Sequence, residues 1–202
     1  MGQILFAERY YHDQVASPDV QVAAGKKYLV EMVNLDGAIY TKDGTIVKAF
    51  GLEPFFNPSQ GLNIKDDMSD PVLLFDKLSG RWFASISDIT EHSIRVAVSK
   101  TEDPTGIWRI YNFPFMSQPN NCSDQPFFGV SEDKVVVTVN NWGNDCNWSS
   151  GNRPPEFRGV QLTVAYKIDL INGSSYVKAL QSESDLSYFS VHPIINLSPR
   201  HC

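Results

Sequence analysis

Two segments of the chain open on a similar pattern, Ser69-Asp70-Pro71-Val72-Leu73-Leu74-Phe75 and Ser123-Asp124-Gln125-Pro126-Phe127-Phe128-Gly129-Val130, with Asp70 and Asp124 54 positions apart. Ser17-Pro18-Asp19-Val20-Gln21-Val22 comes 51 positions before the first of them, counted from Asp19 to Asp70. Ser184-Asp185-Leu186-Ser187-Tyr188-Phe189 opens a fourth unit after a longer interval. A pattern that returns at about 50 residues predicts a repeat architecture, in which each unit is one supersecondary structure.

The residues after each opening predict four β-strands. Apolar and polar residues alternate with a period of two, most clearly from Val160 to Asp169, and no window shows a helical apolar stripe. Turn signals such as Asp43-Gly44 and Ser79-Gly80 separate the strands. The expected strands are 20–23, 28–34, 38–41 and 45–49 in the first unit, 72–76, 81–87, 93–100 and 108–113 in the second, and 127–131, 134–141, 159–169 and 176–181 in the third.

Four strands repeated at this interval are typical of the blades of a β-propeller, whereas a sandwich would not repeat its opening motif. We therefore predict an all-β fold, a β-propeller with four-stranded antiparallel blades. The expected blades cover residues 17–68, 69–122 and 123–183, and a fourth combines 184–202 with 1–16. Either that fourth blade closes a small propeller, or the chain is part of a larger one.

The composition narrows the class of protein. The 202 residues contain 17 Lys and Arg against 23 Asp and Glu, a net charge of −6, which argues against a nucleic-acid partner. No apolar stretch approaches the length of a membrane span, roughly 18 residues or more. The first residues have no basic start followed by a long apolar run, so no signal peptide is expected within this sequence.

The cysteines indicate the compartment. Cys122 and Cys146 enclose a segment rich in Asn and Ser, and a disulfide across a loop of roughly 25 residues would stabilise the fold by about 3 kcal/mol. Two unpaired thiols are the alternative. Cys202 then has no partner left, which indicates a truncated chain or an intermolecular bond.

Four Asn-x-Ser/Thr sequons also favour export, because N-glycans are added to exported proteins. All four fall at expected turns or strand ends: Asn121, Asn147, Asn172 and Asn196. Together with the expected disulfide they predict an extracellular or cell-surface protein.

The stretch from Ser99 to Trp108 lies between the third and fourth strands of the second unit. It resembles, in stretched form, the Asp-box turn of secreted sialidase-like (BNR-repeat-like) β-propeller proteins, and the resemblance extends along the chain. It implies structural roles for three residues. Asp103 accepts bonds from turn amides, Gly106 permits a positive φ, and Trp108 packs between neighbouring blades.

A sialidase would also need a basic cluster, a nucleophilic Tyr with a Glu partner, and an acidic Asp. Candidates exist, but no Arg-Ile-Pro motif is present and the arginines occupy unlike positions in their units; they are Arg81, Arg95, Arg109, Arg158, Tyr111, Tyr166 and Glu156. Asp70 and Asp124 could approach each other near a central channel as a carboxylate pair. We expect them instead to bond to turn amides of their own blades, and we assign no catalytic residue.

Two loops are candidates for binding. The segment Trp142–Trp148 presents Trp142, Asp145 and Trp148, which could stack on a sugar and bond to its hydroxyls, although Trp packing beneath a loop is the alternative. The stretch 66–70 offers carboxylates to Ca²⁺ but lacks EF-hand spacing, so a solvated acidic loop is the alternative. No residue is assigned as a metal ligand.

From these observations we expect an exported, non-catalytic β-propeller that acts as a binding, adhesion or cell-surface assembly module. Its partner would be a protein or a glycan at a surface, and self-assembly is a further option. The alternative function is a sialidase-like glycoside hydrolase.

Overall fold

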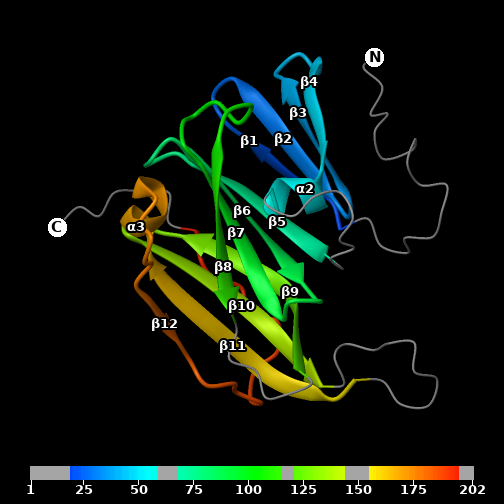
Figure 1. The fold of residues 1–202 in the computed structure, drawn as a ribbon, viewed down its shortest axis with the longest axis vertical. Coiled ribbons are helices and arrows are strands. Elements are labelled where there is room, and N and C mark those ends of the chain that lie inside the picture. The colour runs from blue at the N-terminus through cyan, green and yellow to red at the C-terminus, as the bar shows by residue number, and fades with distance from the viewer. Residues whose placement is uncertain (1–18, 59–67, 115–120, 144–154, 196–202) are drawn as a thin grey trace.

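The computed structural model describes residues 19–58, 68–114, 121–143 and 155–195. They form three four-stranded antiparallel sheets, each about 50 residues of chain, packed together (Figure 1). In every sheet the strands pair in the order in which they occur in the sequence. The prediction of an all-β fold with repeated four-stranded units is confirmed.

The strands lie close to their expected positions. The first sheet contains β1 (Gln21–Ala24), β2 (Tyr28–Val33), β3 (Asp36–Thr41) and β4 (Ile46–Gly51). The second contains β5 (Met68–Asp76), β6 (Arg81–Asp88), β7 (Ser93–Ser99) and β8 (Trp108–Pro114). The third contains β9 (Asn121–Val130), β10 (Lys134–Gly143), β11 (Phe157–Tyr166) and β12 (Ala179–Gln181).

Two short helices connect the strands. α2 (Leu52–Phe56) follows the first sheet, and α3 (Lys167–Asn172) interrupts the third. The strand expected to continue to residue 169 therefore ends at Tyr166, so that part of the prediction is wrong. Gly173 ends α3 in the left-handed conformation at φ 77°, which glycine adopts without strain. Alternation alone did not reveal a helix of only six residues.

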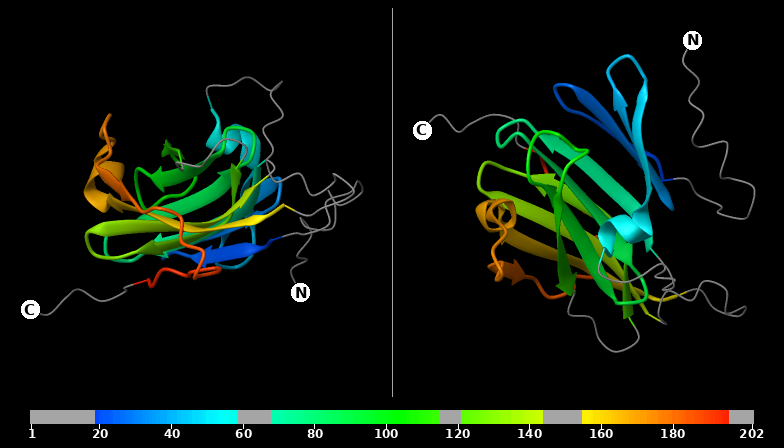
Figure 2. Two further views of the ribbon diagram at one scale, coloured as in Figure 1. Left: turned by 90° about the horizontal axis from the view of Figure 1, so that it is seen from below. Right: turned by 45° about the horizontal axis from the view of Figure 1, so that its top comes forward.

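The first strands of the three sheets lie side by side. β5 contacts both β1 and β9, and the sheets stay distinct in both views of Figure 2. One apolar core fills the space between the first and second sheets, and a second fills the space between the second and third. Trp82 anchors the first core: it is fully buried, packs on Phe75 with ring centroids 4.9 Å apart, and donates from Nε1 to the Glu102 carbonyl at 2.8 Å.

One residue at the opening of each sheet has left-handed backbone. These residues are Asp19 (φ 40°), Asp70 (φ 56°) and Gln125 (φ 49°), and Ser190 (φ 51°) shows the same feature after the third sheet. Residues other than glycine rarely adopt this conformation, so its return marks equivalent positions. Gln125, not Asp124, is therefore the counterpart of Asp70, which corrects the alignment of the two opening motifs.

Asparagine side chains bond to the backbone at two of these openings. Asn34, just after β2, donates to the Asp19 carboxylate at 2.6 Å and accepts from the Asp70 amide at 3.0 Å. Asn140 on β10 does the same later in the chain: it donates to the Gln125 side chain at 3.0 Å and accepts from the Ser190 amide at 3.0 Å. The segment Ser190–Ile195 thus meets the third sheet as β5 meets the first.

The expected fourth opening at Ser184-Asp185 lies elsewhere. Asp185 exchanges two backbone hydrogen bonds with Val160 of β11, both 2.9 Å, so this stretch belongs to the outer side of the third sheet. The recurring opening features return five residues after Asp185, at Ser190. Residues 1–18 and 196–202, which would complete the expected fourth blade, lie outside the described residues. Among the described helices, none has the length and apolar character needed to cross a membrane.

A buried ion pair joins the second and third sheets at their other end. Lys167 of α3 lies 3.0 Å from the Asp76 carboxylate, and the two side chains are 5% and 2% exposed. Lys167 also donates to the Ser131 carbonyl, while the Leu78 and Ser79 amides donate to Asp76. Because both charges are withdrawn from water, loss of either partner would leave the other uncompensated.

We predict that Lys167→Met lowers the free energy of unfolding by about 3–5 kcal/mol, because it leaves Asp76 charged and buried. Urea denaturation measures the change. The matched control is Lys26→Met, which removes an ion pair with Glu102 whose side chains are 72% and 37% exposed; it should cost less than about 1 kcal/mol. Equal losses in the two variants would contradict this account.

Candidate functional site

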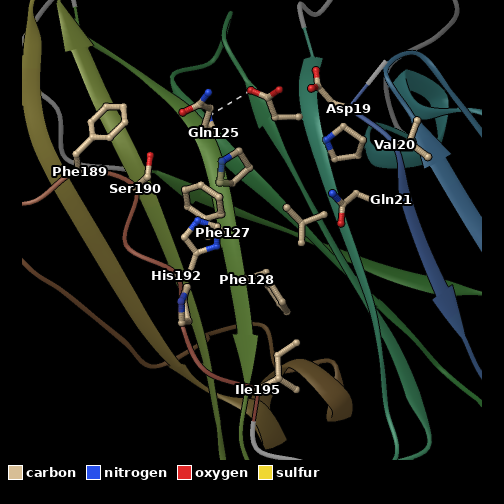
Figure 3. Close-up of a pocket in the computed structure, with 15 residues that line it drawn as sticks. Asp19, Val20, Gln21, Gln125, Phe127, Phe128, Phe189, Ser190, His192 and Ile195 are labelled. Carbon is tan, nitrogen blue, oxygen red and sulfur yellow. Dashed lines mark hydrogen bonds between the residues drawn. The ribbon is translucent and has the colours of Figure 1, made fainter. Parts of the chain in front are cut away.

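A cavity of about 780 Å³ lies where the openings of the three sheets meet the segment Ser190–Ile195. Figure 3 shows its lining, which comes from four separate parts of the chain. Its volume falls within the range of small-molecule sites, about 300–1,000 Å³. We call it the inter-sheet cavity; it is lined by Asp19, Val20, Gln21, Asp70, Pro71, Val72, Gln125, Pro126, Phe127, Phe128, Phe189, Ser190, His192, Pro193 and Ile195.

The polar part of the lining is formed by the left-handed opening residues. Asp70 holds the central position, because its amide donates to Asn34 of the first sheet and its carboxylate accepts from the Gln125 amide of the third at 3.3 Å (dashed in Figure 3). Its carboxyl group also hydrogen-bonds to Asp124 and Asp19. The expectation that Asp70 bonds to turn amides of its own unit is therefore wrong: it connects three sheets.

Burial and the neighbouring carboxyl groups of Asp124 and Asp19 change the protonation of Asp70. Its pKa is raised to about 8, first because burial withdraws the group from water, and then through the hydrogen bond and the negative charge of Asp124 and the charge of Asp19. Asp70 therefore retains its proton at neutral pH. Among the described residues of the lining, none is a lysine or arginine that would offset the carboxylates.

The remainder of the lining is largely aromatic. The rings of Phe127 and His192 lie 3.7 Å apart between centroids. Phe189 is 60% exposed and packs edge-on against Phe157, with centroids 5.3 Å apart. Trp142 contacts both Phe157 and Phe189, at 5.2 and 6.3 Å. The cavity thus combines carboxylate, amide and hydroxyl groups with exposed ring surface.

Only part of the predicted binding loop is described. Trp142 ends up half-buried on β10, behind Phe189, so it supports the cavity wall and does not line the cavity. Asp145 and Trp148 lie outside the described residues. Trp142 lies close to the cavity because it is near the end of β10, the strand that also carries Asn140.

The turn that resembles an Asp box connects β7 to β8. Asp103 accepts from the amide and hydroxyl of Thr105, at 2.9 and 2.7 Å. Trp108 donates to the Pro104 carbonyl at 2.8 Å and packs edge-on against Phe55 of α2. Gly106, expected at positive φ, is not among the residues with that conformation. None of these residues lines the inter-sheet cavity.

Only some of the cysteines and sequons that predict export lie in the described part of the chain. Cys122 is fully buried and disulfide-bonded, while Cys146 lies outside the described residues, so their pairing stays a prediction. Asn121 is only 7% exposed within β9, which makes it a poor acceptor for a glycan, whereas Asn172 is exposed at the end of α3. Asn147 and Asn196 also lie outside the described residues.

The candidate sialidase residues do not converge in the described part of the chain. Arg95 pairs with the buried Asp88, and Arg158 pairs with Glu156. Arg109 and Tyr111 both donate to carbonyls of α3, those of Ile171 and Leu170. Arg81 donates to carbonyls of its own hairpin, and Tyr166 lies beneath the ammonium of Lys134.

Among the described residues, no three His, Cys, Asp or Glu side chains already have a metal-binding arrangement. Of the acidic stretch 66–70, only Met68, Ser69 and Asp70 are described. The sequence analysis identified Asp70 and Asp124 but missed Gln125, Phe189, Ser190 and His192 as neighbours. The sequence signal for Ser190 and His192 was weak, because their segment has almost no residue types in common with the other sheet openings.

Comparisons with protein-family models, with curated proteins and with solved structures found no match.

The pKa of Asp70 makes stability depend on pH. A folded-state pKa near 8, against an ordinary 3.8, means that the folded protein holds a proton that the unfolded chain releases between these values. The contribution of Asp70 to stability is therefore greatest below about pH 4, where both states are protonated, and it falls as the pH rises toward 8. From pH 6 to pH 9 we expect a loss of about 2–3 kcal/mol, which solvent screening of this partly exposed group reduces, measured by urea denaturation in EDTA.

In Asp70→Asn the loss should largely disappear, because an amide does not titrate. Asp43→Asn is the control: this carboxyl is fully exposed and its pKa is lowered by bonds to Thr41 and Thr45, so its removal should leave the slope above pH 6 unchanged. Stability that rises with pH, or an unchanged slope in Asp70→Asn, would contradict the shared-proton arrangement.

Proposed function

We propose that the protein is an exported, non-catalytic binding module and that the inter-sheet cavity holds a glycan. The observation that carries the proposal is the composition of the lining. Carboxylates, amides and a hydroxyl line the cavity together with the rings of Phe189 and Phe127. Sugars present hydroxyl groups on their edges and apolar C–H faces, which such groups bind by hydrogen bonds and stacking.

We also propose that the three sheets are consecutive blades of a β-propeller. The supporting observations are the left-handed opening residues and the asparagine connections, which recur from sheet to sheet and reach Ser190. In such a ring the cavity would lie at the axis, where many blades contribute to one site. An experimental structure in which Ser190–Ile195 pairs with strands of a fourth sheet is the expected result; a segment packed outside the ring of sheets would contradict it.

Export is the corresponding proposal for the location. A disulfide-bonded Cys122 suits an oxidising compartment, where structural disulfides persist. An adhesion or surface-assembly role is consistent with the exposed aromatic and aliphatic residues of the C-terminal part, including Tyr176, Leu186 and Tyr188.

The hydrolase alternative has weaker support. Asp70 holds its proton at neutral pH, as a general acid does. However, its carboxyl group hydrogen-bonds directly to that of Asp124, whereas the paired carboxyls of glycosidases stand about 5–9.5 Å apart. The candidate arginines lie outside the cavity lining.

We predict that at least one neutral methyl glycoside from a panel of common monosaccharides binds in the cavity, as observed by saturation-transfer NMR and titrated by calorimetry. Phe189→Ala should weaken that binding about fivefold, because a stacked ring is worth about 1 kcal/mol. Tyr176→Ala is the matched control, since this aromatic residue is 78% exposed and does not line the cavity.

Binding that is unaffected by Phe189→Ala, or no binding by any glycoside, would overturn the cavity proposal. Turnover of a sialoside or aryl glycoside that disappears in Asp70→Asn would establish the hydrolase instead.

A further inference from the structure

The junction between the second and third sheets departs from the other two. Asn34, Ser87 and Asn140 follow one another at intervals of 53 residues. The strand pairing shows that these positions are equivalent. In the first sheet, Met32 lies two residues before Asn34 and pairs with Gln21, which lies two residues after the left-handed Asp19. In the second sheet, Ser85 lies two residues before Ser87 and pairs with Val72, which lies two residues after the left-handed Asp70. Serine therefore stands at the junction of the second and third sheets, whereas asparagine occupies the equivalent position between the first and second sheets and between the third sheet and Ser190.

Within the described parts of the chain, no protein group hydrogen-bonds to the Ser87 side chain. It is 0% exposed, and its hydroxyl group makes no hydrogen bond. Residues alternate along β6, so Ser87 faces the same side as Phe83, whose ring packs on Phe128 of β9 at 6.1 Å. The hydroxyl is thus directed toward the opening of the third sheet, where the longer asparagines reach their partners.

Two carboxyl groups meet at this junction. Asp70 belongs to the second sheet and Asp124 to the third, and they hydrogen-bond to each other. Asp70 also accepts from the Gln125 amide directly, in place of the connection that an asparagine makes at the other junctions. A buried hydroxyl that has no partner among the described residues and two carboxyl groups therefore face the junction between β6 and β9.

We propose that Ser87, Asp70 and Asp124 form a site for a hard divalent cation, Ca²⁺ by the chemistry of its ligands. The set consists only of oxygen atoms, which Ca²⁺ prefers, and two carboxylates can supply up to four of its six to eight ligands. The Ser87 hydroxyl adds a neutral oxygen, and water from the inter-sheet cavity, which Asp70 lines, completes the shell. Zn²⁺ would instead require nitrogen or sulfur ligands.

The cation would connect the sheets where the asparagine is missing. At the first and third junctions an amide bonds to both neighbours, and at the second the ion would bind one carboxylate from each sheet. Its charge would also offset the repulsion between the two carboxylates.

Ser87→Ala tests the site, and Ser85→Ala is its matched control. Both serines are 0% exposed, lie on the same face of β6 and have hydroxyl groups without a partner among the described residues. Ser85, however, pairs with Val72 and does not lie beside the carboxyl groups. Neither change removes a protein hydrogen bond, so both variants should fold with a Tm near that of the wild-type protein in EDTA.

The measurement is the thermal unfolding midpoint of the wild-type protein and both variants in EDTA and in millimolar CaCl₂, with calorimetric titration of Ca²⁺. We expect Ca²⁺ to raise the Tm of the wild-type protein and of Ser85→Ala equally. Ser87→Ala should weaken Ca²⁺ binding by about tenfold or more, and Asp124→Asn should abolish it. A wild-type Tm that does not respond to Ca²⁺, or a response that survives Ser87→Ala unchanged, would overturn the proposal.

Discussion

The arrangement of the sheets depends on buried amide side chains that each bond to two separate parts of the chain. Asn34 is 9% exposed and Asn140 is fully buried, and each donates to the opening residue of its own sheet. Asn34 accepts from the Asp70 amide of the second sheet, and Asn140 accepts from the Ser190 amide in the segment after the third sheet. Apolar packing between sheets is nearly non-directional, so it leaves their relative position loosely determined. Hydrogen bonds in a buried site have narrow geometry, and an unpaired amide there is costly. Asn34 therefore sets the position of the second sheet against the first, and Asn140 sets the position of the segment Ser190–Ile195 against the third.

This constraint also explains why the cavity lies where it does. The left-handed backbone at Asp19, Asp70 and Gln125 turns each opening toward the amide that binds it. The side chains of those same residues then face the space between the sheets. A structural device that repeats along the chain thus places polar groups from different sheets around one cavity, which is why distant residues meet there.

Most of the fold could be predicted from the sequence because it follows from local patterns. Period-two alternation and turn residues marked β1 to β11 within a few positions, and the interval between openings revealed the units. The helix α3 was missed because six residues show too little periodicity, and Asp185 was misplaced because a Ser-Asp pair also occurs at a sheet edge. Residue identity also aligned Asp124 with Asp70, whereas the left-handed backbone conformation aligns Gln125 with Asp70. Conformation at a single residue leaves no reliable trace in its identity.

The site was harder to predict, and the reason lies in where the repeat fails. Three equivalent positions are equally spaced but do not carry the same side chain: Asn34, Ser87 and Asn140. A search for identical residue types at the repeat interval does not detect the serine. If the three positions served only to hold the sheets, an asparagine at 87 would satisfy the junction and would leave no hydroxyl group without a partner. Instead the second junction combines that hydroxyl with two carboxyl groups in direct contact, which costs stability unless a proton or a cation lies between them. Departures from local consistency concentrate at functional sites, because stability there is given up for chemistry. The break in the repeat at Ser87 is therefore a stronger indication of function than the motifs that recur.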